Sequence, residues 1–175
     1  MNIDKLKALA KSEIFALSKN VNATDVYFLI QALDEKDDAA RYNAFLLLQS
    51  SSRESPLVYE YWSILERKLE CPNSYQRSLG LMLIAENVRW DKKDNFSKTI
   101  SKYLHRCSDE KFITARQAIQ GLEVILKSTD KFDEEIKQSL TDLQVSKYKE
   151  NQQKLVRKDL SNILQMIENK NARLK

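Results

Sequence analysis

Glycine and proline are scarce in this chain of 175 residues, which contains two of each. A β-rich fold needs such residues in its tight turns, so their scarcity favours helices joined by short polar loops. Both glycines lie inside apolar runs of helical periodicity, Gly80 in SLGLMLIAE and Gly121 in AIQGLEVIL. Glycine inside a helix costs about 1 kcal/mol relative to alanine, so both positions require a packing explanation.

Histidine and cysteine are equally scarce, and this excludes several kinds of site. The chain has one histidine, His105, and two cysteines, Cys71 and Cys107, without a C-x-x-C pair. His105 and Cys107 cannot complete a zinc site by themselves. A Ser–His–Asp or Cys–His nucleophile would have to use His105, and the sequence has no P-loop, G-x-G-x-x-G or G-x-S-x-G motif. We expect no catalytic residue, no metal site and no cofactor.

Long apolar runs are also missing. A signal peptide needs about 7–15 apolar residues and a membrane span about 20, and the first residues, MNIDKLKALAKSEIFALS, carry charges throughout. Together with the lone cysteines, this predicts a cytoplasmic protein with reduced thiols and without a membrane partner.

Helical periodicity covers nearly the whole chain and predicts about nine helices. Thr24 and Asn73 are the expected N-caps of two of them, Asn73 with Gln76 as capping-box partner, and SSSRES at 50–55 is the clearest loop. No stretch has the composition of a flexible linker, so we expect a single domain, residues 1–175. The expected helices span 4–17, 24–33, 39–49, 56–69, 74–90, 93–106, 109–128, 132–144 and 150–169.

The net charge of +4 is concentrated at the C-terminal end. Residues 146–175 contain eight Lys or Arg and three Asp or Glu, whereas the rest of the chain contains 21 and 22. We expect a basic C-terminal helix at 146–175. It forms either a phosphate-facing patch or the solvated cap that a stack of helix pairs needs at its end.

A small residue recurs at one place in four of the expected helices. Ala44, Gly80, Gly121 and Ser161 follow one another at spacings of 36, 41 and 40 residues. In the first three copies, apolar residues stand one, three and four positions later. A period near 40 made of helix pairs predicts a helical solenoid, in which small residues let helix axes approach closely. The alternative is an ordinary helical bundle with two incidental glycines.

The segment DDAARYNAFLLL at 37–48 resembles the second helix of a HEAT repeat, in which a cation precedes the small residue by three positions. Arg41 and Arg77 match this pattern and Lys158 matches it loosely, whereas the third copy carries its arginine at 116. The resemblance implies an all-α, right-handed superhelical α-solenoid of about four HEAT-like helix pairs over residues 20–170.

The resemblance carries no catalytic motif. The closing segment LVRKDLSNILQMI at 155–167 is also similar to the last helix of small bacterial HEAT-like proteins. This implies a non-enzymatic scaffold that presents a curved helical surface to a protein partner. The second hypothesis is a nucleic-acid-binding protein with a basic concave face, distantly similar to HEAT-like DNA alkylation-repair glycosylases. Against this hypothesis, a DNA-binding groove is normally richer in Arg and Lys than the first 145 residues are. A small helical enzyme or a subunit of a larger complex is the third.

Second helices line the concave face of HEAT-like solenoids, so cations there would either contact an acidic ligand or form a structural ladder between repeats. For the ladder, Asp37 and Asn73, one turn earlier, are the nearest partners on the same helices. Tryptophans would either grip a partner or pack in the core. The candidate partner-binding residues are Arg41, Arg77, Arg116, Arg157, Lys158, Trp62 and Trp90.

Overall fold

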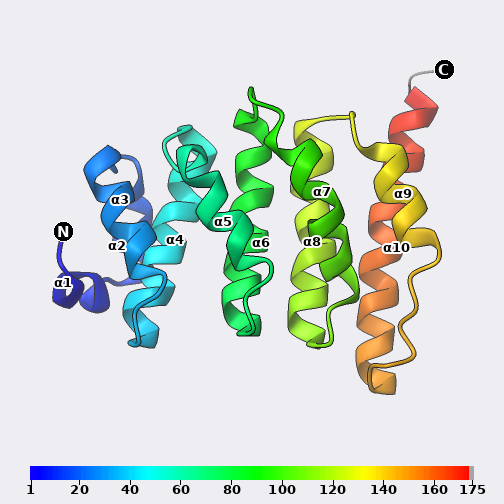
Figure 1. Ribbon diagram of the computed structural model, residues 1–175, viewed down its shortest axis with the longest axis horizontal. Helices are drawn as coiled ribbons and strands as arrows, with labels where there is room; N and C mark the ends of the chain where they lie inside the picture. Colours follow the sequence, from blue (N-terminus) through cyan, green and yellow to red (C-terminus); the bar gives the residue numbers. More distant parts are fainter. Residues whose placement is uncertain (174–175) are drawn as a thin grey trace.

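The computed structural model describes residues 1–173, which form helices and connecting loops without a β-strand (Figure 1). About 76% of the described residues are helical, which confirms the all-α prediction. The α-helices are α1 (Ile3–Ala8), α2 (Lys11–Ser18), α3 (Ala23–Ala32), α4 (Asp38–Glu54), α5 (Trp62–Lys68), α6 (Ser74–Asn87), α7 (Asn95–His105), α8 (Phe112–Ser128), α9 (Asp133–Thr141) and α10 (Glu150–Arg173). Three 3-10 turns extend them, η1 (Tyr59–Tyr61), η2 (Val88–Trp90) and η3 (Arg106–Ser108).

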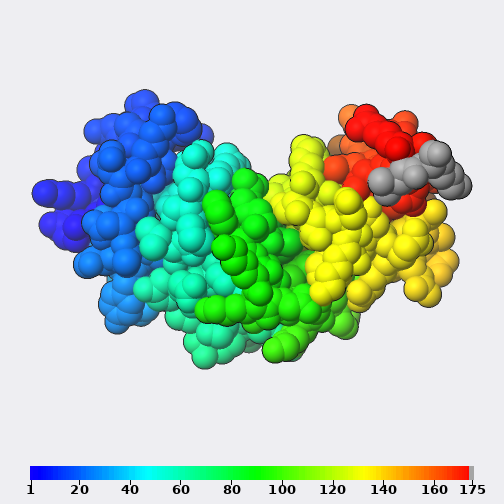
Figure 2. Space-filling view, turned by 90° about the horizontal axis from the view of Figure 1, so that it is seen from above, coloured from blue at the N-terminus to red at the C-terminus, as the bar shows by residue number. Residues whose placement is uncertain are grey.

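The helices are arranged in two layers along the long axis of the molecule (Figure 1). Helices α5, α7 and α9 form the nearer layer in this view, and α4, α6, α8 and α10 lie side by side behind them, each in contact with the next. Seen from above, the molecule is bent, with a hollow between its two ends (Figure 2). The layer of α4, α6, α8 and α10 forms this hollowed side.

Both glycines lie where a helix of one layer crosses a helix of the other. A Cβ added to Gly80 would lie 2.9 Å from the Leu65 carbonyl oxygen and 2.9 Å from Lys68 Cβ, both on α5. A Cβ on Gly121 would lie 2.2 Å from Tyr103 Oη of α7 and 3.3 Å from the Cβ of Ala85. Neither contact can be accommodated without a shift. The prediction that the two glycines permit close helix crossings is confirmed.

Hydrogen bonds between side chains of one helix pair and groups of the next follow a regular spacing. They join residues between 32 positions apart, as for Tyr59 and Asp91, and 44 positions apart, as for Lys170 and the Leu126 carbonyl. Trp62 and Thr99, 37 positions apart, are a buried example. Each pair is therefore tied to the next pair along the chain.

Six of the expected helices match within four residues at each end: 24–33 matches α3, 74–90 matches α6, and 93–106, 109–128, 132–144 and 150–169 match α7 to α10. The first expected helix, 4–17, is wrong, because Leu9 and Ala10 adopt extended backbone and separate α1 from α2. The helix expected at 56–69 begins instead with a turn and a 3-10 segment, and α5 is only seven residues long.

The loop predicted at 50–55 is also wrong, because α4 continues through it to Glu54. Ser51 and Ser52 are buried against the next helix pair, and Ser52 Oγ donates a hydrogen bond to the Leu48 carbonyl oxygen. Ser52 Oγ also accepts a hydrogen bond from the side chain of Asn87 on α6. Serine has a low intrinsic propensity for helix interiors, but burial and these hydrogen bonds outweigh that low helix propensity here.

The two predicted N-caps have different outcomes. Asn73 Oδ1 accepts hydrogen bonds from the backbone N–H groups of Tyr75 and Gln76, which confirms it as the cap of α6. Gln76 is not its capping-box partner, since its side chain donates to the Leu33 carbonyl oxygen. The cap of α3 is Asn22 rather than Thr24.

Candidate functional site

A groove of about 400 Å³ crosses the N-terminal halves of α4, α6 and α8. On α6, its residues Tyr75, Ser78 and Met82 lie opposite Gly80, which faces α5. The groove therefore opens away from the layer of α5, α7 and α9, on the hollowed side. It is lined by Tyr42, Phe45, Ser74, Tyr75, Ser78, Leu79, Met82, Lys111, Ile113, Thr114 and Gln117.

Three large apolar or aromatic side chains stand exposed along this groove, one from each helix. Tyr42 of α4 is 42% exposed, Tyr75 of α6 is 36% exposed and Ile113 of α8 is 59% exposed. Beneath them, Phe45 and Leu79 belong to the core. Exposed apolar side chains that gather in one groove mark interaction surfaces more often than scattered ones do.

Arg41 marks the α4 end of the groove. Its guanidinium lies 4.6 Å from the ring centroid of Tyr75, a cation–π contact. It also donates to the Glu35 carbonyl oxygen at 2.9 Å and pairs with Asp38 on its own helix. The ladder partner suggested for it, Asp37, instead caps the Ala40 N–H. Arg41 thus supports the wall of the groove.

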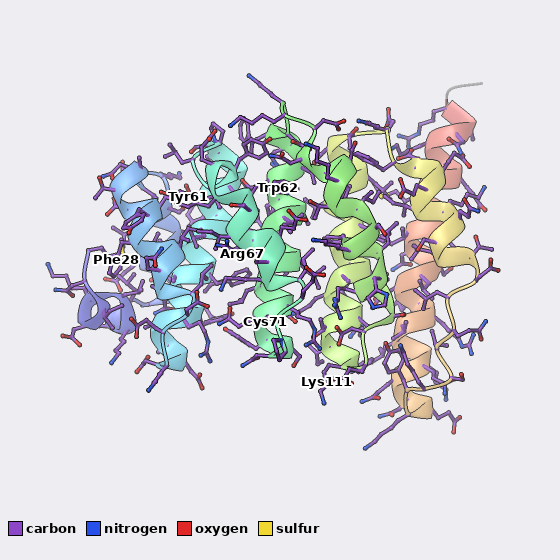
Figure 3. All side chains as sticks on the ribbon, viewed as in Figure 1. Phe28, Tyr61, Trp62, Arg67, Cys71 and Lys111 are labelled. Atoms are coloured by element: carbon purple, nitrogen blue, oxygen red, sulfur yellow. The ribbon has the colours of Figure 1, made fainter. Side chains whose placement is uncertain are left out.

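Lys111 marks the opposite end of the groove. It is the N-cap residue of α8; its side chain makes no capping hydrogen bond, and its backbone N–H donates to Asp109 Oδ1 at 2.9 Å. Figure 3 shows it at the lower end of α8. The side chain is exposed and, within residues 1–173, takes part in no ion pair. Among the described residues, it is the only charged one in the lining of the groove.

Arg77 lies in the core, not in the groove. Its Nε and Nη2 donate to the Asp109 carboxylate at 2.7 and 2.8 Å, and its Nη1 donates to the Cys71 and Pro72 carbonyl oxygens. These bonds to Asp109 raise the pKa of Arg77. Burial, the largest single influence, would raise the pKa of the Asp109 carboxyl, but the hydrogen bonds from Arg77 and from the Lys111 backbone N–H, together with the charges of Arg77 and Arg106, lower it. Asn73 does not pair with Arg77, so the ladder contact runs to the next repeat.

Arg116 also joins one helix pair to the next. Its Nε donates to the carboxylate of Asp159 on α10 at 2.6 Å, and Gln120 donates to the same carboxylate at 3.3 Å. The hydrogen bond to Asp159 raises the pKa of Arg116. Arg157 and Lys158 are exposed on α10. The three cations predicted to share one repeat position therefore differ, because Arg77 is buried in a joint between helix pairs, Arg41 contacts Tyr75 and Lys158 is exposed on α10.

The two tryptophans pack between helix pairs. Trp62 is 5% exposed, and its Nε1 donates to Thr99 Oγ1 of α7 at 3.0 Å. Trp90 is half-buried, and its Nε1 donates to the Ser52 carbonyl oxygen at 2.6 Å. Both side chains fix neighbouring pairs to each other, so we assign them to packing.

The groove residues Tyr42, Tyr75 and Ile113 were not anticipated from the sequence. The sequence signal that could have found them is their position around the helix axis, since an apolar residue outside the buried stripe of an amphipathic helix is exposed. That signal is weak here because ten of the fourteen residues of α6 are buried, so its buried stripe covers most of the helix.

The remaining titratable groups form no reactive centre in the part of the chain that the structure describes. Residues 1–173 contain no group of three or more His, Cys, Asp or Glu placed to hold a metal ion. Both cysteines are free, and burial raises the pKa of the Cys107 thiol, which disfavours its reactive thiolate. His105 lines a polar hollow of about 700 Å³ between α7 and α9. Over the same residues, the structure contains no helix with the length and apolar character of a membrane span.

Comparison of the chain with protein-family models, curated proteins and solved structures returned no match.

Proposed function

We propose that this chain is a HEAT-like, right-handed α-solenoid that acts as a non-enzymatic scaffold and binds a protein partner in the groove of Tyr42, Tyr75 and Ile113. The observation that carries the proposal is the set of three exposed apolar or aromatic side chains on the neighbouring helices α4, α6 and α8 of the hollowed side. Tyrosine and other large apolar residues dominate the energetics of protein interfaces.

The repeat assignment is supported by the regular spacing of the hydrogen bonds between helix pairs. In a solenoid each repeat contacts only its neighbours, so contacts between repeats cluster at one sequence separation. The side-by-side row of α4, α6, α8 and α10 also supports it (Figure 1). A single-domain, cytoplasmic protein is consistent with this proposal and stays a prediction.

A capture experiment with matched variants tests the docking site. Ile113→Asp places a charge in the groove, and Tyr27→Asp places one at an equally exposed residue, 59% in both cases, on α3. The full-length variants are compared with the wild type for the proteins that they retain from an extract of the source cells. We expect partners that the wild type and Tyr27→Asp retain and that Ile113→Asp loses. Equal retention by the two variants would contradict a docking site in this groove.

The nucleic-acid alternative rests on the exposed cations Arg157 and Lys158 of α10. Against it, the described part of the chain contributes one cation to the groove lining. A gel-shift titration on duplex DNA decides between the two classes. Binding that weakens steeply with salt and is lost in Arg157→Glu/Lys158→Glu would favour nucleic acid over a protein partner.

A further inference from the structure

The groove wall holds a polar atom that the protein itself leaves unsatisfied. The side-chain carbonyl oxygen of Gln117, in this wall, is buried and accepts no hydrogen bond within the described residues. Native proteins satisfy nearly all such atoms, so one in the wall of a groove requires an explanation.

The charge of the groove is the second observation. Among the residues that the structure describes, its only charged lining residue is Lys111, the N-cap residue of α8. The corresponding caps of α4 and α6 are Asp37 and Asn73, which accept backbone hydrogen bonds. At α8 a cation stands in that place, and Asp109 Oδ1 accepts the Lys111 backbone N–H at 2.9 Å. The Lys111 ammonium takes part in no ion pair within residues 1–173, so a carboxylate from outside would complement it.

We propose, building on the proposed function, that the groove binds an extended, acidic segment of a partner protein. One or two apolar side chains of the segment lie among Tyr42, Tyr75 and Ile113, and an Asp or Glu of the segment pairs with Lys111. The segment's backbone donates a hydrogen bond to the side-chain carbonyl oxygen of Gln117 once this side chain turns toward it.

The choice of an extended segment over a helix follows from the hydrogen bonds. A helix satisfies its own backbone N–H and C=O groups, whereas an extended peptide offers both to its receptor. The volume agrees, because about 400 Å³ lies near the lower end of the range of about 300–1,000 Å³ for ligand pockets. That space holds a few side chains rather than a whole helix.

A display library of random peptides, selected on the full-length protein, tests the proposal. Peptides are kept only if Ile113→Asp fails to capture them and Tyr27→Asp captures them. We expect the retained set to be enriched in sequences that combine apolar residues with Asp or Glu. If no peptide passes this filter, the groove is not a docking site for protein segments, and both this proposal and the proposed function fail.

Charge reversal then separates the two proposals. Lys111→Glu should weaken binding of the acidic peptides at least about tenfold, the scale of one charge-assisted hydrogen bond. The same variant should bind a peptide in which Lys replaces the acidic residue better than it binds the original peptide. Lys92→Glu, an exposed lysine in the loop before α7, is the matched control and should change neither. Groove-dependent peptides that ignore Lys111→Glu would overturn the acidic assignment and leave the scaffold intact.

Gln117→Leu tests the hydrogen bonds independently of charge. Because the Gln117 carbonyl oxygen is unsatisfied in the free protein, leucine should hold or raise the melting temperature while weakening peptide binding several-fold. If Gln117→Leu bound the selected peptides with unchanged affinity, the argument for an extended segment would fail. It would also fail if circular dichroism showed that the selected peptides are helical when bound. Self-association through the groove, detected by sedimentation and lost in Ile113→Asp, would instead assign the groove to a second copy of the chain.

Discussion

Arg41 and Arg77 occupy the same position of two successive helix pairs, yet they do different things. Arg77 is buried and links α6 to Asp109, in the loop before α8. Arg41 stays on α4 and contacts Asp38 and the ring of Tyr75. The reason lies in the following loop, because Cys71 stands three residues before α6, where Asp109 stands three residues before α8. A repeat position thus acquires its role from the loop it meets.

Replacing Arg77 should have the largest effect on this comparison. Arg77→Ala leaves the Asp109 carboxylate, fully buried, without its main partner, and breaking a buried pair from one side costs about 3–5 kcal/mol. Urea denaturation measures the free energy of unfolding. The double variant Arg77→Ala/Asp109→Ala should recover part of the loss. A melting temperature within a degree of the wild type for Arg77→Ala would contradict a structural role.

Filling the space at Gly121 should have the next largest effect. Gly121→Ala improves helix propensity but places a Cβ against Tyr103 Oη, and we expect a net loss of about 1–3 kcal/mol from overpacking. Ser161, at the equivalent place of α10, is exposed. Ser161→Ala should therefore raise stability slightly, by about 0.5 kcal/mol or less. If both alanine variants melt above the wild type, the close-crossing explanation is wrong.

Lowering the pH should selectively weaken the ion pair between Arg77 and Asp109. The Asp109 pKa is lowered in the folded state, so the stability from this carboxylate is fully present above its unfolded pKa of about 3.9 and is lost as the pH falls through the lower folded value. Asp109→Asn should therefore show a flatter loss of stability below pH 4 than the wild type. Thermal melts between pH 2 and pH 7 measure this, and identical acid profiles would rule out the contribution.

Arg41→Ala should have the smallest effect on stability. Its partner Asp38 is 90% exposed, and such pairs contribute about 0–1 kcal/mol. Arg41 supports Tyr75, so peptide binding in the groove should fall more than stability does. Comparing the melting temperature with the affinity of the selected peptides separates the two. A loss of stability as large as that of Arg77→Ala would erase the difference between the two repeat positions.

Much of the fold was predictable from local pattern. The later helices, the Asn73 cap and the glycine crossings follow from periodicity, capping chemistry and one recurring small residue. The serine-rich stretch at 50–55 was not, because its helix depends on burial against the next pair. The groove could not be predicted for the same reason, since the exposure of Ile113 depends on which neighbours flank α8.

The sequence by itself determined that this protein is helical, with small residues at about a 40-residue spacing, because periodicity and glycine placement are local properties. Only the tertiary structure decided which cations join one helix pair to the next. Arg77 meets Asp109 across 32 positions and Arg116 meets Asp159 across 43, and no local rule selects those partners. The same packing of α4, α6 and α8 brought Tyr42, Tyr75 and Ile113 into one groove.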